Sequence, residues 1–161
     1  MQNGIFLGQG KYVMEILKNF GRMDCKAMAT PMASNMKLLS DVSLESVDAT
    51  MYCYMILMYL MNTRLDILFA VNTLSQFLTD PRHVHLIAGK HILRYLKGTV
   101  DYGIKYEANQ KINLEGYVDL DWAGSANNRK INLGCCFSMG SGVISWFSRK
   151  QLCVALSTTE A

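Results

Sequence analysis

The hydrophobic period of this chain changes once, just after residue 103, and this change constrains the fold more than any other feature of the sequence. Up to that point apolar residues recur every three or four positions, as on one face of a helix. Beyond it, the segments 114–122, 133–140 and 142–150 have the pattern of strands, with a glycine-rich hairpin turn at 139–142. Because helices precede strands instead of alternating with them, the sequence predicts an α+β fold.

The clearest helix lies near the amino terminus. One helix face carries apolar residues at the i, i+3, i+4 and i+7 positions, namely Val13, Ile16, Leu17 and Phe20. Gly21 follows, and glycine is favoured just past the end of a helix. The short apolar run at 4–9 predicts a strand or part of a hairpin.

Three further helices are expected over about 50–62, 65–78 and 82–97. Pro81 is placed to open the last of them and Gly98 to end it. Small polar residues dominate 25–50, which predicts a long surface connection. The inner sides of the last two helices are expected to carry Ile67, Leu68, Val71, Leu74, Ser75 and Leu78, and then Leu86, Leu93 and Leu96.

The composition is that of a globular chain. Its 161 residues, 50% of them apolar, suffice for one domain or two incomplete ones, and a net charge of +3 is too small to argue for a polyanionic partner. Five cysteines without a C-x-x-C pair indicate reduced thiols in the core. The most apolar stretch, 51–61, is shorter than the ~20 residues that span a bilayer. Since no secretory signal follows Met1, we expect an intracellular protein, cytoplasmic or nuclear, without membrane contact.

The most basic surface is expected on the helix at 82–97. Lys90, Arg94 and Lys97 follow one another at i, i+4 and i+7, and no acid lies within that helix. A solvated helix face would explain these residues, and so would contact with the phosphates of a nucleic acid. The sequence pattern leaves both interpretations open.

The first predicted strand of the later part holds two acids that a buried strand does not need. Side chains alternate across a strand, so Tyr117, Asp119 and Asp121 share one face. The other face carries Val118, Leu120 and Trp122. Acids can protect the wet face of an edge strand, or they can bind Mg²⁺, which prefers carboxylate oxygens. Residues i and i+2 lie roughly 6.5 Å apart along a strand, so a shared ion would need a third carboxylate from elsewhere.

Several blocks of the sequence, in order, resemble the Pol polyprotein of copia-type LTR retrotransposons. Residues 116–130, 140–151 and 154–161 are similar to the start of its ribonuclease H domain. Upstream blocks resemble the segment that joins the reverse transcriptase palm to that domain, and they comprise residues 10–21, 25–32, 59–77 and 91–99.

The resemblance implies two domains. Residues 1–106 would be the C-terminal part of reverse transcriptase, a mainly helical segment like the palm end, thumb and connection. Residues 107–161 would be the N-terminal part of a ribonuclease H-like domain, truncated to three strands and the start of a helix. The family role would be to synthesise DNA on an RNA template. It would also cleave the RNA strand of RNA–DNA hybrids with two Mg²⁺ ions.

The metal ligands of that family can be matched to this chain. A carboxylate on the first strand and a glutamate at the start of the first helix correspond to Asp119 and Glu160. Asp121 stands where the copia group also has an acid, but it is not assigned as a ligand. Glu160 also completes a capping-box pattern with Ser157, so a structural role in starting the helix remains an alternative.

The departures from the family predict an incomplete enzyme. Two further ribonuclease H acids are expected beyond Ala161, and the paired polymerase aspartates before Met1. We therefore expect a catalytically incomplete chain that retains weak binding of RNA–DNA hybrid or other nucleic acid through Lys90, Arg94 and Lys97. The alternative is a co-opted protein-interaction or regulatory module without enzymatic activity. In either case exposed strands would favour self-association.

Overall fold

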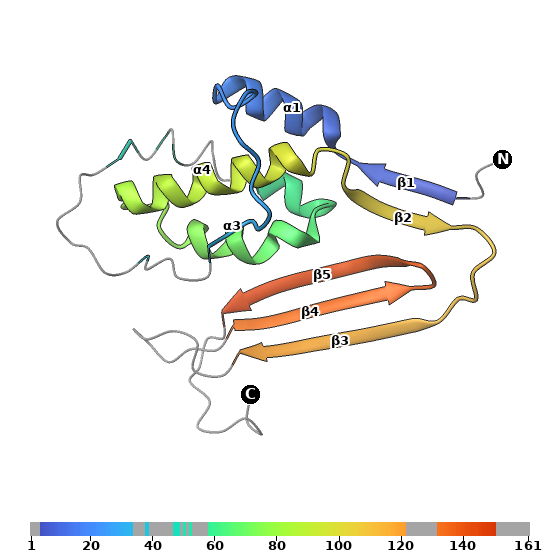
Figure 1. Ribbon diagram of the computed structural model, residues 1–161. Helices are drawn as coiled ribbons and strands as arrows, with labels where there is room; N and C mark the ends of the chain where they lie inside the picture. Colours follow the sequence, from blue (N-terminus) through green and yellow to red (C-terminus); the bar gives the residue numbers. More distant parts are fainter. Residues whose placement is uncertain are drawn as a thin grey trace, which may run out of the picture. The chain divides into compact units, whose positions relative to one another are not determined.

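The computed structural model describes residues 4–33, 38, 47, 48, 50, 52, 58–121 and 132–150 (Figure 1). The chain divides into two compact units. Residues 7–103 form a helical unit, and residues 4–6 group with residue 104 and beyond in a unit of strands. The expected α+β composition is confirmed. No helix among the described residues is long and apolar enough to cross a membrane.

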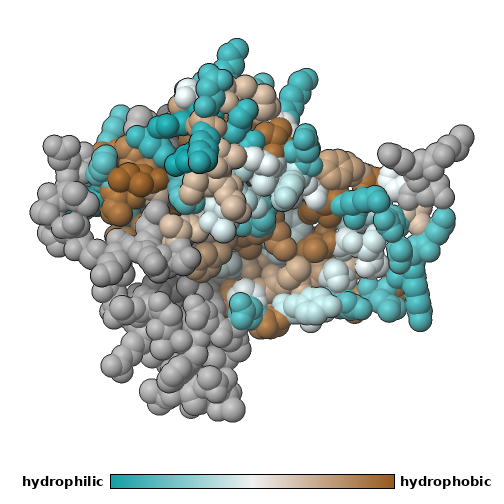
Figure 2. All heavy atoms as spheres, in the orientation of Figure 1, coloured by the Kyte–Doolittle hydropathy of each residue, from teal (hydrophilic) through white to brown (hydrophobic). Residues whose placement is uncertain are grey.

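The first helix of the helical unit is α1 (Gly10–Asn19), and the sequence predicts it well. Val13, Ile16 and Leu17 are buried on one face. The top of Figure 2, where α1 lies, shows many hydrophilic side chains with some apolar ones between them, and Tyr12 and Met14 of α1 are exposed. Gly21 follows with φ of 60°, a left-handed conformation that costs glycine little and most other residues more. The one-sided periodicity and the glycine stop are therefore both confirmed.

Helices α3 (Leu68–Ser75) and α4 (His83–Gly98) confirm the expected helices at 65–78 and 82–97. The former begins as a separate 3₁₀ turn, η2 (Leu65–Ile67). Only part of the expected helix at 50–62 falls within the described residues, and its last five residues form a 3₁₀ helix, η1 (Met58–Asn62). Residues 25–33 of the expected connection have no helix or strand, and most of the remainder lies outside the described residues.

The core of the helical unit lies between α1, α3 and α4, since both α1 and α3 contact α4 (Figure 1). The buried apolar residues are Val13, Ile16, Leu17, Tyr52, Leu60, Ile67, Ala70, Val71, Leu74, Leu86, Ala88, Ile92, Leu93, Tyr95 and Leu96. Burial of each such aliphatic side chain stabilises the folded state by about 1.5–3 kcal/mol relative to leaving it exposed. The hydroxyl of the fully buried Tyr52 is satisfied, because Tyr52 Oη donates to the Leu74 carbonyl at 2.8 Å.

The strand unit contains an antiparallel sheet in the order β3-β4-β5, formed by β3 (Leu114–Asp121), β4 (Asn132–Met139) and β5 (Gly142–Lys150). All three strands were expected from the sequence. Gly140 has φ of 63° in the turn between β4 and β5, as the glycine-rich hairpin pattern predicts. A register irregularity lies between Phe137 and Ser138 of β4.

A second sheet pairs β1 (Gly4–Gly8) with β2 (Gly103–Glu107). The sequence predicted β1 but not β2, whose five residues are too few for a clear period. Tyr106 of β2 reaches β5, and its hydroxyl donates to the Val143 carbonyl at 2.6 Å. A Cβ added to Gly142 would lie 2.5 Å from Cε1 of the Tyr106 ring, so the ring packs where only glycine leaves space.

None of the described apolar side chains of the strand unit is fully buried. Leu114 is 70% exposed, and Tyr117 and Val118 are each 61% exposed although they lie on opposite faces of β3. The expectation of a buried strand is therefore wrong for the described part of β3. The expectation of core cysteines is also wrong for Cys135 and Cys136, which are free but half-buried. A single sheet buries its faces only where other layers cover them.

Candidate functional site

Asp119, the predicted metal ligand, lies on β3 at the edge of the three-stranded sheet, and its side chain is exposed. It pairs across the sheet with Gly134 of β4. A Cβ added to Gly134 would lie 3.8 Å from the Cβ of Asp119. Because glycine has no side chain, the Asp119 carboxylate has open space on the neighbouring strand.

The other described acid on this face, Glu115, is bound to a neighbour. The Tyr117 hydroxyl donates to Glu115 Oε2 at 2.8 Å, and this hydrogen bond together with the nearby negative charge raises the pKa of Tyr117. Glu115 and Asp119 are four residues apart on one strand, roughly 13 Å, which is too far for a shared ion.

The described residues do not by themselves provide a magnesium site. No group of three His, Cys, Asp or Glu side chains among them could hold a metal ion. The second predicted ligand, Glu160, and the side chain of Asp121 lie outside the described part of the chain. One exposed carboxylate does not fit the several oxygen ligands that Mg²⁺ requires. The metal assignment of Asp119 and Glu160 therefore stays a prediction.

The three residues predicted to bind nucleic acid, Lys90, Arg94 and Lys97, lie on α4, and each is half-buried. Arg94 differs from the two lysines because it is hydrogen-bonded, with its Nε donating to the Lys26 carbonyl at 2.8 Å. The side chains of Lys90 and Lys97 have no hydrogen bond or ion pair to another described residue. The lysines are therefore available to a ligand, whereas Arg94 already uses its Nε to bind another segment of the protein.

The partner of Arg94 belongs to a short segment that lies along α4, residues 26–30, which we call the strap. Besides the Arg94 side-chain bond, the Met28 amide donates to the Arg94 carbonyl at 3.2 Å. The Thr30 carbonyl lies 3.0 Å from His91 Nε2, which must carry the proton because a carbonyl only accepts. A Cβ added to Gly98 would lie 3.0 Å from the Cβ of Ala27, so a larger residue there would crowd the strap.

No ion pair between described residues neutralises the charge of this face. The ion pairs within the described ranges are Arg64–Asp66, Arg82–Asp80 and Lys105–Glu107. None of them involves the strap or the part of α4 from Lys90 onward. The arrangement can therefore attract an anion with several phosphates or carboxylates.

Comparison with known proteins places the chain in a family. It is 39% identical over 160 residues to a retrovirus-related Pol polyprotein from transposon RE1 of Arabidopsis thaliana, and the match covers 98% of this chain and 11% of that protein. The chain belongs to the copia-type retrotransposon Pol family. No family profile matches it, and no solved structure matches it.

Shorter proteins resemble the same Pol segment. An uncharacterized mitochondrial protein of Arabidopsis thaliana, AtMg00810, is 38% identical over 161 residues, which are 98% of this chain and 66% of that protein. A secreted RxLR effector protein of Plasmopara viticola is 42% identical over 117 residues, 73% of this chain and 78% of that protein. The chain thus spans about a tenth of the RE1 polyprotein and just under two thirds of the mitochondrial relative.

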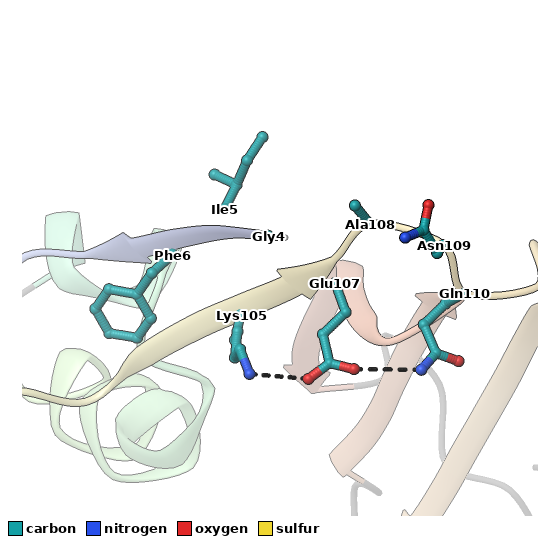
Figure 3. A pocket seen from close by; sticks show the side chains of 8 residues that line it. All are labelled: Gly4, Ile5, Phe6, Lys105, Glu107, Ala108, Asn109 and Gln110. Atoms are coloured by element: carbon teal, nitrogen blue, oxygen red, sulfur yellow. Dashed lines mark hydrogen bonds and ion pairs between the residues drawn. The ribbon is translucent and has the colours of Figure 1, made fainter. Parts of the chain in front are cut away.

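A hollow of about 570 Å³ lies beside β1 and β2 of this Pol segment, and Gly4, Ile5 and Phe6 form part of its wall. Figure 3 shows three of its polar side chains, Lys105, Glu107 and Gln110, bound to one another, and Asn109 not joined to them. Lys105 Nζ donates to Glu107 Oε1 at 2.8 Å, and Gln110 Nε2 donates to Glu107 Oε2 at 3.2 Å. These two bonds lower the pKa of Glu107, first through Lys105 and then through Gln110. Because three of the lining polar groups bind one another, the hollow shows no distinctive chemistry.

Sequence reasoning missed a buried polar cluster around Arg64, which is 1% exposed. Its Nε and Nη2 donate to the two Asp66 oxygens at 2.9 and 2.7 Å. Its Nη1 and Nη2 also donate to the carbonyl and hydroxyl of Thr99, at 2.9 and 2.6 Å. Thr99 follows α4, so this guanidinium fastens the end of α4 to the turn at η2. The only signal in the sequence is an Arg and an Asp two residues apart.

The electrostatics of this cluster favour the ionised pair. Burial raises the pKa of Asp66, but the hydrogen bonds from Arg64 and Tyr95 outweigh it and the pKa is lowered overall. Tyr95 donates to Asp66 Oδ2 at 2.7 Å. Burial, and then this hydrogen bond, raise the pKa of Tyr95 to about 12. Every buried side-chain nitrogen and oxygen of the cluster has at least one hydrogen-bond partner within the described part of the chain, so we assign it a structural role.

A second missed residue is His85, which is 3% exposed at the start of α4. Its Nδ1 accepts a hydrogen bond from the Arg82 amide at 2.9 Å, and its Nε2 donates to the Leu38 carbonyl at 3.0 Å. The ring stacks on Phe77 with centroids 3.9 Å apart. Burial lowers the pKa of His85 more than its bond to Leu38 raises it, so the neutral ring is favoured.

Proposed function

We propose that this chain is a segment of a retrotransposon reverse transcriptase and ribonuclease H polyprotein that binds nucleic acid through α4 and does not cleave it alone. The observation that carries the proposal is the basic face of α4, where Lys90 and Lys97 are free of ion pairs among the described residues. Lysines without acidic partners can neutralise phosphates and release counterions. Membership of a Pol family makes an RNA–DNA hybrid the natural probe.

Binding is tested by fluorescence anisotropy of a labelled RNA–DNA hybrid between 50 and 200 mM salt. The triple variant Lys90→Glu, Arg94→Glu and Lys97→Glu is expected to lose most of the affinity and most of the salt dependence. A matched control reverses the charge of three lysines away from α4, Lys11, Lys18 and Lys111, which are exposed, and so makes the same change in net charge. If both triple variants bind equally, net charge alone attracts the hybrid and the proposal for α4 fails.

We propose that this segment does not cleave the hybrid by itself, because the residues assigned to the metal within it are few. Asp119 and Glu160 would bind Mg²⁺, and two carboxylates are fewer than a two-metal site uses. We expect no cleavage of the hybrid by the folded chain with either Mg²⁺ or Mn²⁺. Cleavage that disappears in Asp119→Asn would contradict this expectation and would mean that the carboxylates present suffice.

A second candidate function is that of a protein-interaction module. It is supported by the exposed apolar side chains on β3 and by the outer edge of β3, which pairs with no further strand among the described residues. Exposed edges of this kind can pair with a strand of another molecule. It is also supported by similarity to an RxLR effector, 78% of which is covered by this segment. Sedimentation equilibrium tests it, since a monomer at all concentrations would rule out self-association through these strands.

A further inference from the structure

Both the side chain and the main-chain carbonyl of Arg94 are hydrogen-bonded to the strap. The side-chain Nε donates to the Lys26 carbonyl at 2.8 Å, and the main-chain carbonyl accepts from the Met28 amide at 3.2 Å. Lys90 and Lys97, one turn to either side, make no such bonds to described residues. Arg94 is thus the only member of the predicted basic trio whose polar atoms hold another segment in the described part of the chain.

The strap brings a fourth cation to the basic face. Lys26 is exposed, and its own carbonyl is the acceptor of the Arg94 bond. Its main chain is therefore fixed beside α4, and its side chain is free to reach a ligand. The acid nearest to Lys26 in the sequence is Asp24, and the acid nearest to Lys97 is Asp101. Neither forms an ion pair with a described residue.

We infer that Arg94 is a positioning residue that holds the strap, and that the phosphate-binding surface consists of Lys26, Lys90 and Lys97. This inference rests on the proposed function, because it assumes that the basic face binds a sugar-phosphate backbone. An arginine fixed through Nε by a carbonyl supports the surface, and the three lysines contact the phosphates as mobile point charges.

Glutamine and methionine at position 94 separate the two roles. The glutamine Nε2 stands the same number of bonds from Cα as the arginine Nε, so Arg94→Gln keeps the donor and removes the charge. Arg94→Met removes both. We expect Arg94→Met to lower the hydrogen-exchange protection of the Met28 amide about tenfold, and Arg94→Gln to change it little. Lys90→Gln is the matched control and should leave Met28 unchanged. Unchanged protection in Arg94→Met would overturn the positioning role.

The salt dependence of hybrid binding tests the surface. Each lost phosphate contact lowers the slope of log affinity against log salt by about one. Lys26→Gln and Arg94→Met should each lower it by about one, and the double variant by no more than either alone. Arg94→Gln should preserve it. A slope lowered by about one in Arg94→Gln, or by about two in the double variant, would show direct phosphate contact by Arg94 and overturn the inference. If no variant binds hybrid, the proposed function and the surface fail together, while Met28 exchange still decides the positioning role.

Discussion

Replacement of Arg64 by methionine is the sharpest test of how the helical unit is held together. Methionine fills much of the same space but donates no hydrogen bond. The substitution leaves the Thr99 carbonyl without its donor at 2.9 Å and the Asp66 carboxylate without its counter-ion at 2.7 Å. Both acceptors were satisfied by a guanidinium that is 1% exposed.

The expected loss can be estimated from these contacts. Removing one partner of a buried ion pair costs about 3–5 kcal/mol, and an unsatisfied buried acceptor costs about 1–3 kcal/mol. Since the Asp66 side chain is 31% exposed, water can replace part of what Arg64 supplied. We therefore expect the free energy of unfolding to fall by about 3 kcal/mol, a large share of the 5–15 kcal/mol typical of a domain.

Urea denaturation followed by circular dichroism measures this loss. Asp80→Asn, which breaks the exposed pair with Arg82, is the control and should cost under about 1 kcal/mol. In the double variant Arg64→Met and Asp66→Asn the losses should be less than additive by at least about 1 kcal/mol, because no unpaired charge remains. Equal losses in Arg64→Met and the control would refute the reasoning.

The same pair makes stability depend on pH. The pKa of Asp66 is lowered in the folded chain, so the pair stabilises the fold fully above the unfolded value of about 3.9. This contribution is lost as pH falls through the lowered folded pKa. In Arg64→Met that part of the acid transition should disappear, and an unchanged pH profile would argue against the assigned cause.

Three further perturbations test other parts of the chain. His85 has a lowered pKa, so the unfolded state binds its proton first and stability should fall as pH drops below about 6.5; His85→Gln should flatten that dependence in urea titrations, and an unaltered slope would exclude His85 as the cause. Tyr52→Phe should cost about 1–2 kcal/mol by leaving the Leu74 carbonyl unpaired, and a loss below about 0.5 kcal/mol would mean that water reaches it. Gly142→Ala should displace the Tyr106 ring and speed hydrogen exchange in β5, whereas wild-type exchange rates would show that the ring yields without cost.

The helices of residues 7–103 were predictable because their burial follows a period written in the chain. Val13, Ile16 and Leu17 of α1 face the core as their spacing requires. The same holds for Leu86, Leu93 and Leu96 of α4. Gly21 after α1 and Gly140 in the β4–β5 turn have positive φ, and the glycines alone indicated these positions without any knowledge of the packing.

The burial of the strands was not predictable, because alternation states which residues share a face and not what covers it. Val118 was assigned correctly to the face opposite Asp119 in the alternation, yet it is 61% exposed. The strand β2 was missed for a related reason. It is defined by pairing with β1, nearly a hundred residues earlier in the chain.

The sequence by itself therefore determined the α+β class, the ends of α1 and α4, and the resemblance that the comparisons with Pol proteins confirmed. Only the tertiary structure decided the roles of the charged residues. It joined Arg64 to Thr99 and Arg94 to Lys26, 35 and 68 residues apart. The physical reason is that periodicity records the average environment of a face, whereas a hydrogen bond depends on which two atoms the folded chain brings within about 3 Å.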